Sequence, residues 1–126
     1  MRFLLSLLAG AAALAAQAQP PAAQPSVRLL VQSSLLAGFR YAEGAEVWPQ
    51  LSAGDALELV REPDNPHDAN AVRVEWRGRK LGYVPRAENG ALAWAMDRGE
   101  ALRARVSRLT EHRNPRRRIE FEVYIE

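Results

Sequence analysis

The fold is decided by residues 56–84, which read ALELVREPDNPHDANAVRVEWRGRKLGYV. In VRVEW, residues 72–76, apolar and charged side chains alternate, which is the period-two pattern of a half-buried strand. The turn RGR, residues 77–79, leads into a second short run, residues 80–84. The two runs predict a β-hairpin, and residues 56–61 predict the strand before it.

The segment between these strands, residues 63–70, reads PDNPHDAN and is dense in turn-forming residues. The two prolines fix φ, and aspartate and asparagine side chains can hydrogen-bond to nearby backbone. We therefore expect an ordered loop here and not a strand.

On either side of this stretch, alternation or β-branched character returns at residues 27–36, 101–109 and 119–126, so the sequence predicts six strands in all. An amphipathic helix is expected over 86–98, with Gly99 as its C-terminal stop, and a short helical turn over 46–51. Because there is no βαβ rhythm, these elements indicate a mainly β fold, a small antiparallel barrel or sheet with one main α-helix closing an end.

The N-terminal residues 1–18 resemble a secretory signal peptide, with an arginine at position 2, an apolar run and the sequence Ala-Gln-Ala before the expected cleavage site. Residues 19–26, rich in proline, alanine and glutamine, predict an extended linker. The folded domain is then expected over 27–126, in an exported protein that is periplasmic or extracellular. Nothing after residue 18 approaches the length of a membrane span.

The composition excludes several kinds of chemistry. The 126 residues include no cysteine, which excludes disulfides, thiolate metal sites and cysteine nucleophiles. The two histidines, His67 and His112, lack zinc-ligand spacing, and the serines lack the Gly-x-Ser-x-Gly context of an esterase nucleophile. We therefore predict no catalytic centre, no metal site and no cofactor, and expect a protein that is not an enzyme.

A basic segment lies near the C-terminus. Seven of the sixteen residues 103–118 are arginine and only Glu111 is acidic, although the whole chain is nearly balanced at 17 Lys+Arg against 15 Asp+Glu. This local excess could neutralise phosphates. The alternative is a solvated hairpin, because Arg103 and Arg105 alternate with apolar residues and would point outward.

A second candidate site combines aromatic and basic residues at the ends of strands: Arg40 and Tyr41, the loop residues 65–68, and residues 83–86. Aromatic rings offer stacking faces for unpaired bases, and arginines hold phosphates. The alternative is that the tyrosine rings simply cap the barrel with their hydroxyls in water.

These residues belong to motifs that resemble the HIRAN domain: Gly38-Phe39-Arg40-Tyr41, then residues 57–74, LELVREPDNPHDANAVRV, then residues 81–86, LGYVPR, and Ala91-Leu92-Ala93 in the helix. The similarity covers about residues 29–109. It implies a small OB-like barrel, in agreement with the six predicted strands. In eukaryotic fork-remodelling helicases, this domain grips the 3′ end of single-stranded DNA.

Carried over by motif, the resemblance implies a nucleic-acid-binding pocket formed by Arg40, Tyr41, Asn65, His67, Asp68, Tyr83 and Arg86. The two arginines would hold phosphates. Tyr41 and His67 would sandwich the terminal base, and Asp68 would accept a hydrogen bond from the free 3′-hydroxyl. A carboxylate accepts from a hydroxyl but repels a phosphate, so it selects a strand end. In the DNA-binding members tyrosine stands at the His67 position and histidine at the Tyr83 position.

Two functions therefore remain open. The first is a binding module for single-stranded DNA and its 3′-hydroxyl end. The second is an exported structural or protein-interaction module whose partner is a protein and whose pocket no longer binds nucleic acid. The first requires the pocket residues to converge in one place, whereas the second does not.

Overall fold

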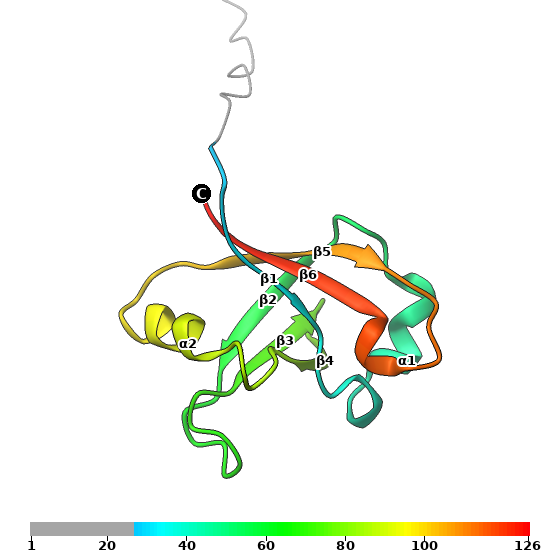
Figure 1. Cartoon of the computed structure of the whole chain (residues 1–126), viewed down its shortest axis with the longest axis horizontal. Helices are drawn as coiled ribbons and strands as arrows, with labels where there is room; N and C mark the ends of the chain where they lie inside the picture. The colour runs from blue at the N-terminus through cyan, green and yellow to red at the C-terminus, as the bar shows by residue number, and fades with distance from the viewer. Residues whose placement is uncertain (1–26) are drawn as a thin grey trace, which may run out of the picture.

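The computed structural model describes residues 27–126, which fold into one antiparallel sheet with short helices at its ends (Figure 1). The expected signal peptide, residues 1–18, and linker, residues 19–26, lie outside the described residues. Within the described part of the chain, no helix is long and apolar enough to cross a membrane.

Six strands form the sheet in the order β1-β6-β5-β2-β3-β4. Their bounds are β1 Leu29–Leu35, β2 Ala56–Arg61, β3 Val72–Trp76, β4 Arg79–Tyr83, β5 Arg103–Leu109 and β6 Ile119–Ile125. All the pairings are antiparallel. The mainly β prediction, with six strands and the hairpin at 72–84, is therefore confirmed.

The two outer strands of the sheet, β1 and β4, meet at one point. Just beyond β1, the Ala37 N–H donates to the Tyr83 carbonyl (2.9 Å), and the Tyr83 N–H donates to the Ala37 carbonyl (2.8 Å). The contact requires glycine at position 82, because a Cβ there would lie 2.2 Å from the Ala37 oxygen. This bridge does not close the sheet, so the term barrel applies only loosely.

The core lies inside the curved sheet. The alternation read in the sequence places Val72, Val74 and Trp76 of β3 on the buried face, while Arg73 and Glu75 are half-buried on the other face. In β6 the buried residues are likewise every second one. This matches the period of a strand that packs one face on a core.

The helices are shorter than the sequence pattern indicates. Helix α2 is Gly90–Asp97, whereas the expected range was 86–98. Residues 86–88 instead form a turn after Pro85, in which the Glu88 N–H donates to the Pro85 carbonyl (2.8 Å). The expected helical turn at 46–51 is formed by α1 Gly44–Val47 and the 3-10 segment η2 Trp48–Gln50. In Figure 1, α1 and α2 lie at opposite ends of the molecule.

The basic segment at 103–118 divides into two parts. On β5, Arg103 pairs with Glu126 (3.3 Å) and Arg105 pairs with Glu122 (3.0 Å) across the β5–β6 ladder. At these two positions the charge is neutralised, as the solvated-hairpin alternative expects, whereas Arg108 is exposed and forms no ion pair within the described residues. The turn that follows, which contains the 3-10 segment η3 Pro115–Arg117, differs and is described below.

Candidate functional site

The loop between β2 and β3 is held by its own side chains. Asn65 Oδ1 accepts from the His67 N–H (2.9 Å), and Asp68 Oδ1 accepts from the Asn70 N–H (2.9 Å). The Asn65 N–H donates to the Glu62 carbonyl (3.1 Å). Together with the two prolines, these bonds give the backbone one shape, so that His67 and Asp68 are displayed at defined positions.

Glu62 joins this loop to strands β3 and β4. Its Oε1 accepts from Asn65 Nδ2 (3.0 Å) and from the Tyr83 hydroxyl (2.9 Å), and its Oε2 accepts from Arg73 Nη1 (2.7 Å). Partial burial raises the pKa of Glu62, but the hydrogen bonds and the Arg73 charge outweigh it and hold the pKa below its usual value. The carboxylate therefore stays ionised and fixes Asn65 and Tyr83 together.

Asp68 is bonded on both oxygens. The Asn70 N–H contributes most to a pKa below the usual value for Asp68, burial opposes it, and the Asn89 amide and the Arg86 and Arg61 charges add to the lowering. Asn89 is only 2% exposed and donates from Nδ2 to Asp68 Oδ2 (2.7 Å). Because Asn89 immediately precedes α2, this bond ties the loop to the helix.

These elements enclose a hollow of about 430 Å³, which we call the loop pocket. Its lining residues are Ala37, Gly38, Asn65, His67, Asp68, Ala71, Lys80, Tyr83, Val84 and Arg86. Small and apolar residues share the wall with a carboxylate, an amide, an imidazole and two cations. Lys80 Nζ lies 4.5 Å from the centre of the Tyr83 ring.

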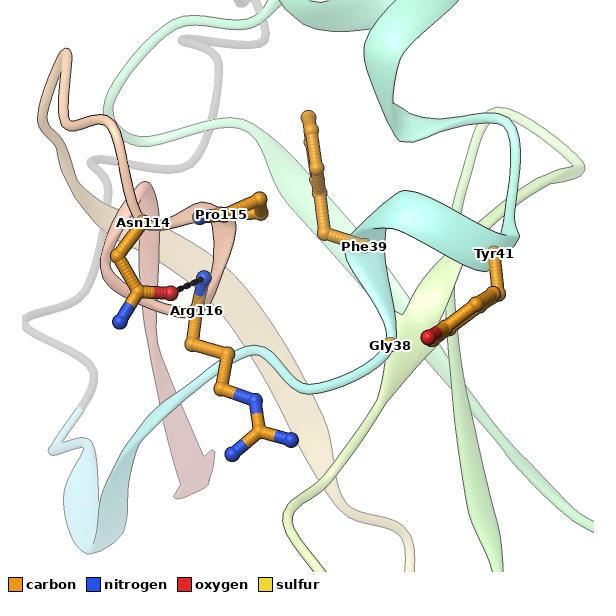
Figure 2. Close-up of a pocket in the computed structure, with 6 residues that line it drawn as sticks. All are labelled: Gly38, Phe39, Tyr41, Asn114, Pro115 and Arg116. Atoms are coloured by element: carbon orange, nitrogen blue, oxygen red, sulfur yellow. Dashed lines mark hydrogen bonds between the residues drawn. The ribbon is translucent and has the colours of Figure 1, made fainter.

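A second hollow of about 310 Å³ lies beside the first, and we call it the turn pocket. It is lined by the 3-10 segment η1 Phe39–Tyr41, by Gly38 before it, and by residues 114–116 of the β5–β6 turn (Figure 2). Gly38 therefore borders both hollows.

The structure thus brings five of the seven predicted site residues to the loop pocket: Asn65, His67, Asp68, Tyr83 and Arg86. Tyr41, which is 81% exposed, lines the turn pocket instead. The backbone of Arg40 lies in η1, but its side chain is outside what the structure describes. Whether these residues bind nucleic acid stays a prediction.

Sequence reasoning missed Lys80, Glu62 and Asn89. Glu62 lies inside the recognised motif but does not line the hollow, so only the fold reveals its role. The sequence did not indicate that Asn89 bonds to the loop, because position 89 falls within the range 86–98 that was expected to be helical. His67 and His112 line different hollows, and residues 27–126 contain no group of three or more His, Cys, Asp or Glu side chains placed to hold a metal ion.

Comparison with known proteins identifies a matching family, related sequences and similar solved structures. The HIRAN domain family model matches residues 29–126. Over 61 residues, or 48% of this chain, the sequence is 36% identical to the helicase-like transcription factor of Oryctolagus cuniculus and 34% identical to that of Homo sapiens. The match spans 6% of the length of those relatives.

Two crystal structures have a similar fold. A protein from Lactobacillus plantarum superposes with a TM-score of 0.68 at 28% identity, covering 78% of this chain and 94% of that chain. The HIRAN domain of human HLTF superposes with a TM-score of 0.60 at 25% identity, covering 77% of each chain.

Proposed function

We propose that this chain, which belongs to the HIRAN domain family, binds single-stranded DNA and recognises a free 3′-hydroxyl end in the loop pocket. The observation that supports this most strongly is the presence of an ionised carboxylate, Asp68, and a cation, Arg86, in the wall of one open hollow. Such a pair matches the two groups at a strand end, a hydroxyl and the phosphate before it.

The Asp68 carboxylate would distinguish a 3′-hydroxyl end from a 3′-phosphate end. Each oxygen of Asp68 already accepts one hydrogen bond, from Asn70 or from Asn89, and each retains a second lone pair for a hydroxyl donor. A phosphate in place of that hydroxyl would bring negative charge against the carboxylate. An aspartate is already ionised at neutral pH, and the lowered pKa of Asp68 extends that charge to more acidic conditions, so this repulsion is present at neutral pH.

Other groups of the loop pocket suit the rest of a nucleotide. Arg86 is exposed and can hold a phosphate. His67 is exposed and offers a ring face for a base, while the Tyr83 ring is fixed through its hydroxyl by Glu62. Base stacking on such rings tolerates any sequence, because every base has a π face.

The test is an anisotropy titration with labelled single-stranded DNA that ends in a 3′-hydroxyl or a 3′-phosphate. We expect the native protein to prefer the hydroxyl end, and Asp68→Asn to reduce that preference by about tenfold or more, the value of one charge-assisted hydrogen bond. Asp64→Asn is the matched control, since it removes the same charge from the same loop outside the loop pocket. Equal binding of both ends by the native protein would contradict end recognition.

If the predicted signal peptide is functional, the proposed ligand is nucleic acid in the periplasm or outside the cell. An exported protein-interaction module is the second candidate, and one observation favours it. Large apolar side chains are exposed on the edge strand β1 and at Val27, two residues before it: Val27 at 75%, Leu29 at 61%, Leu30 at 62%, Val31 at 45% and Leu35 at 42%. Exposed apolar patches mark protein contacts. Absence of DNA binding at low salt would favour this candidate.

A further inference from the structure

We propose that the turn between β5 and β6, residues 112–118, binds phosphates of the same DNA strand on the 5′ side of the nucleotide held in the loop pocket. This rests on the proposed function and extends it from one terminal nucleotide to a strand. We call this segment the arginine turn.

The arginine turn concentrates positive charge that no ion pair in the described part of the chain neutralises. Arg113, Arg116 and Arg117 are exposed and form no ion pair within residues 27–126. Elsewhere in the described chain most arginines are paired with carboxylates: Arg28, Arg61, Arg73, Arg79, Arg98, Arg103 and Arg105. The contrast points to an anionic ligand for the turn and not to general solubility.

The turn is also held in one shape before any ligand arrives. The Asn114 N–H donates to His112 Nδ1 (2.9 Å), and Asn114 Oδ1 accepts from the Arg116 N–H (3.0 Å), the bond drawn in Figure 2. At the end of the turn, Arg118 Nε donates to the His112 carbonyl (2.8 Å). A preformed turn loses less conformational entropy when a ligand binds.

Its position continues the loop pocket. Arg116 lines the turn pocket from the β5–β6 turn and Tyr41 lines it from η1 (Figure 2). Gly38 lines both this hollow and the loop pocket. A strand that leaves the loop pocket past Gly38 therefore enters the turn pocket, where the exposed Tyr41 ring and the exposed Arg116 side chain both line the wall, with Arg113 and Arg117 on the same turn. Proteins use this combination to hold single strands without sequence preference.

The experiment measures how binding depends on strand length. Dithymidylate and decathymidylate, both with a 3′-hydroxyl, are titrated at several salt concentrations against the native protein and the triple variant Arg113→Gln, Arg116→Gln, Arg117→Gln. A control triple variant removes the same charge from exposed sites elsewhere, Arg77→Gln, Arg98→Gln and Arg103→Gln. Circular dichroism verifies that each variant is folded.

We expect the native protein to bind the longer strand more tightly. The turn variant should bind it about tenfold more weakly at low salt, and its slope of log affinity against log salt should be smaller by about 2, since each single-strand phosphate contact contributes about 0.7. Its affinity for dithymidylate should be unchanged, and the control variant should behave as the native protein does.

Equal effects of the turn variant and the control variant would overturn the inference, as would equal affinity of the native protein for the two lengths. In either case binding of dithymidylate would leave the proposed function intact. If the native protein binds neither oligonucleotide, the proposed function fails and the arginine-turn inference fails with it.

Discussion

Replacing Glu62 with glutamine tests whether one carboxylate holds the loop pocket together. The three hydrogen bonds that reach this carboxylate come from separate elements: Asn65 in the loop, Tyr83 on β4 and Arg73 on β3. Glutamine has nearly the same size but no charge, and its amide group presents N–H donors to at least one of these donors. The substitution therefore breaks part of the network without leaving a cavity.

The expected loss follows from the number and exposure of these bonds. Hydrogen bonds to charged groups contribute about 1.5–3 kcal/mol each. Glutamine keeps some of them, and the side chains of Glu62 and Arg73 are 20% and 30% exposed, so water screens the charge pair. We expect the free energy of unfolding to fall by about 1–3 kcal/mol, together with weaker DNA binding because Tyr83 and Asn65 lose their anchor.

Urea unfolding followed by tryptophan fluorescence measures this loss, and its pH dependence identifies the cause. The folded-state pKa of Glu62 is lowered, so its contribution is complete above the ordinary value of 4.5 and is lost as the pH falls through the lower folded-state value. The native protein should therefore lose more stability than Glu62→Gln between neutral pH and a pH below 4.5. Glu58→Gln, an exposed change on β2, is the control. An unchanged free energy of unfolding in Glu62→Gln at neutral pH would show that this carboxylate does not hold the loop pocket together.

Two further predictions concern the sheet contact and the N-terminus. Gly82→Ala should lower the free energy of unfolding by about 1–3 kcal/mol, because its Cβ would lie 2.2 Å from the Ala37 oxygen. Gly90→Ala should leave the free energy of unfolding unchanged, because a Cβ at position 90 has nothing within 4 Å. Equal melting temperatures of the two variants would contradict this prediction. Expression with export should give a mature protein that begins after Ala18, as measured by intact mass, and retention of the full mass would show that the signal peptide prediction is wrong.

The strands could be predicted from the sequence because the signal is local. In β3 and β6 every second side chain is buried, and apolar residues alternate with polar ones in the sequence at the same positions. The contact between Ala37 and Tyr83, by contrast, joins segments far apart in the chain, and no local pattern encodes it. The predicted first residue of α2 was wrong for a related reason. The Asn89 side chain, just before the helix, donates a hydrogen bond to Asp68 on another loop, and no local pattern encodes that contact.

The candidate site was also only partly predictable from the sequence. Asn65, His67 and Asp68 belong to one compact motif, so their convergence in one wall was predictable. Tyr41 was expected in the same pocket as His67 but lines the turn pocket, because η1 packs against the β5–β6 turn and the two segments form that hollow together. That placement depends on packing between distant segments.

Recognition of a 3′-hydroxyl in the loop pocket can be observed directly by a pair of NMR titrations of the amide-labelled protein with short single-stranded DNA that ends in a 3′-hydroxyl or in a 3′-phosphate. The Asn70 N–H donates to the Asp68 carboxylate, so its amide signal reports on that group. We predict shifts at residues 65–70 and 83–86 with the hydroxyl end, and a difference between the two titrations that is largest at Asn70. Shifts confined to β1, or identical shifts with both ends, would contradict recognition of a 3′-hydroxyl in the loop pocket.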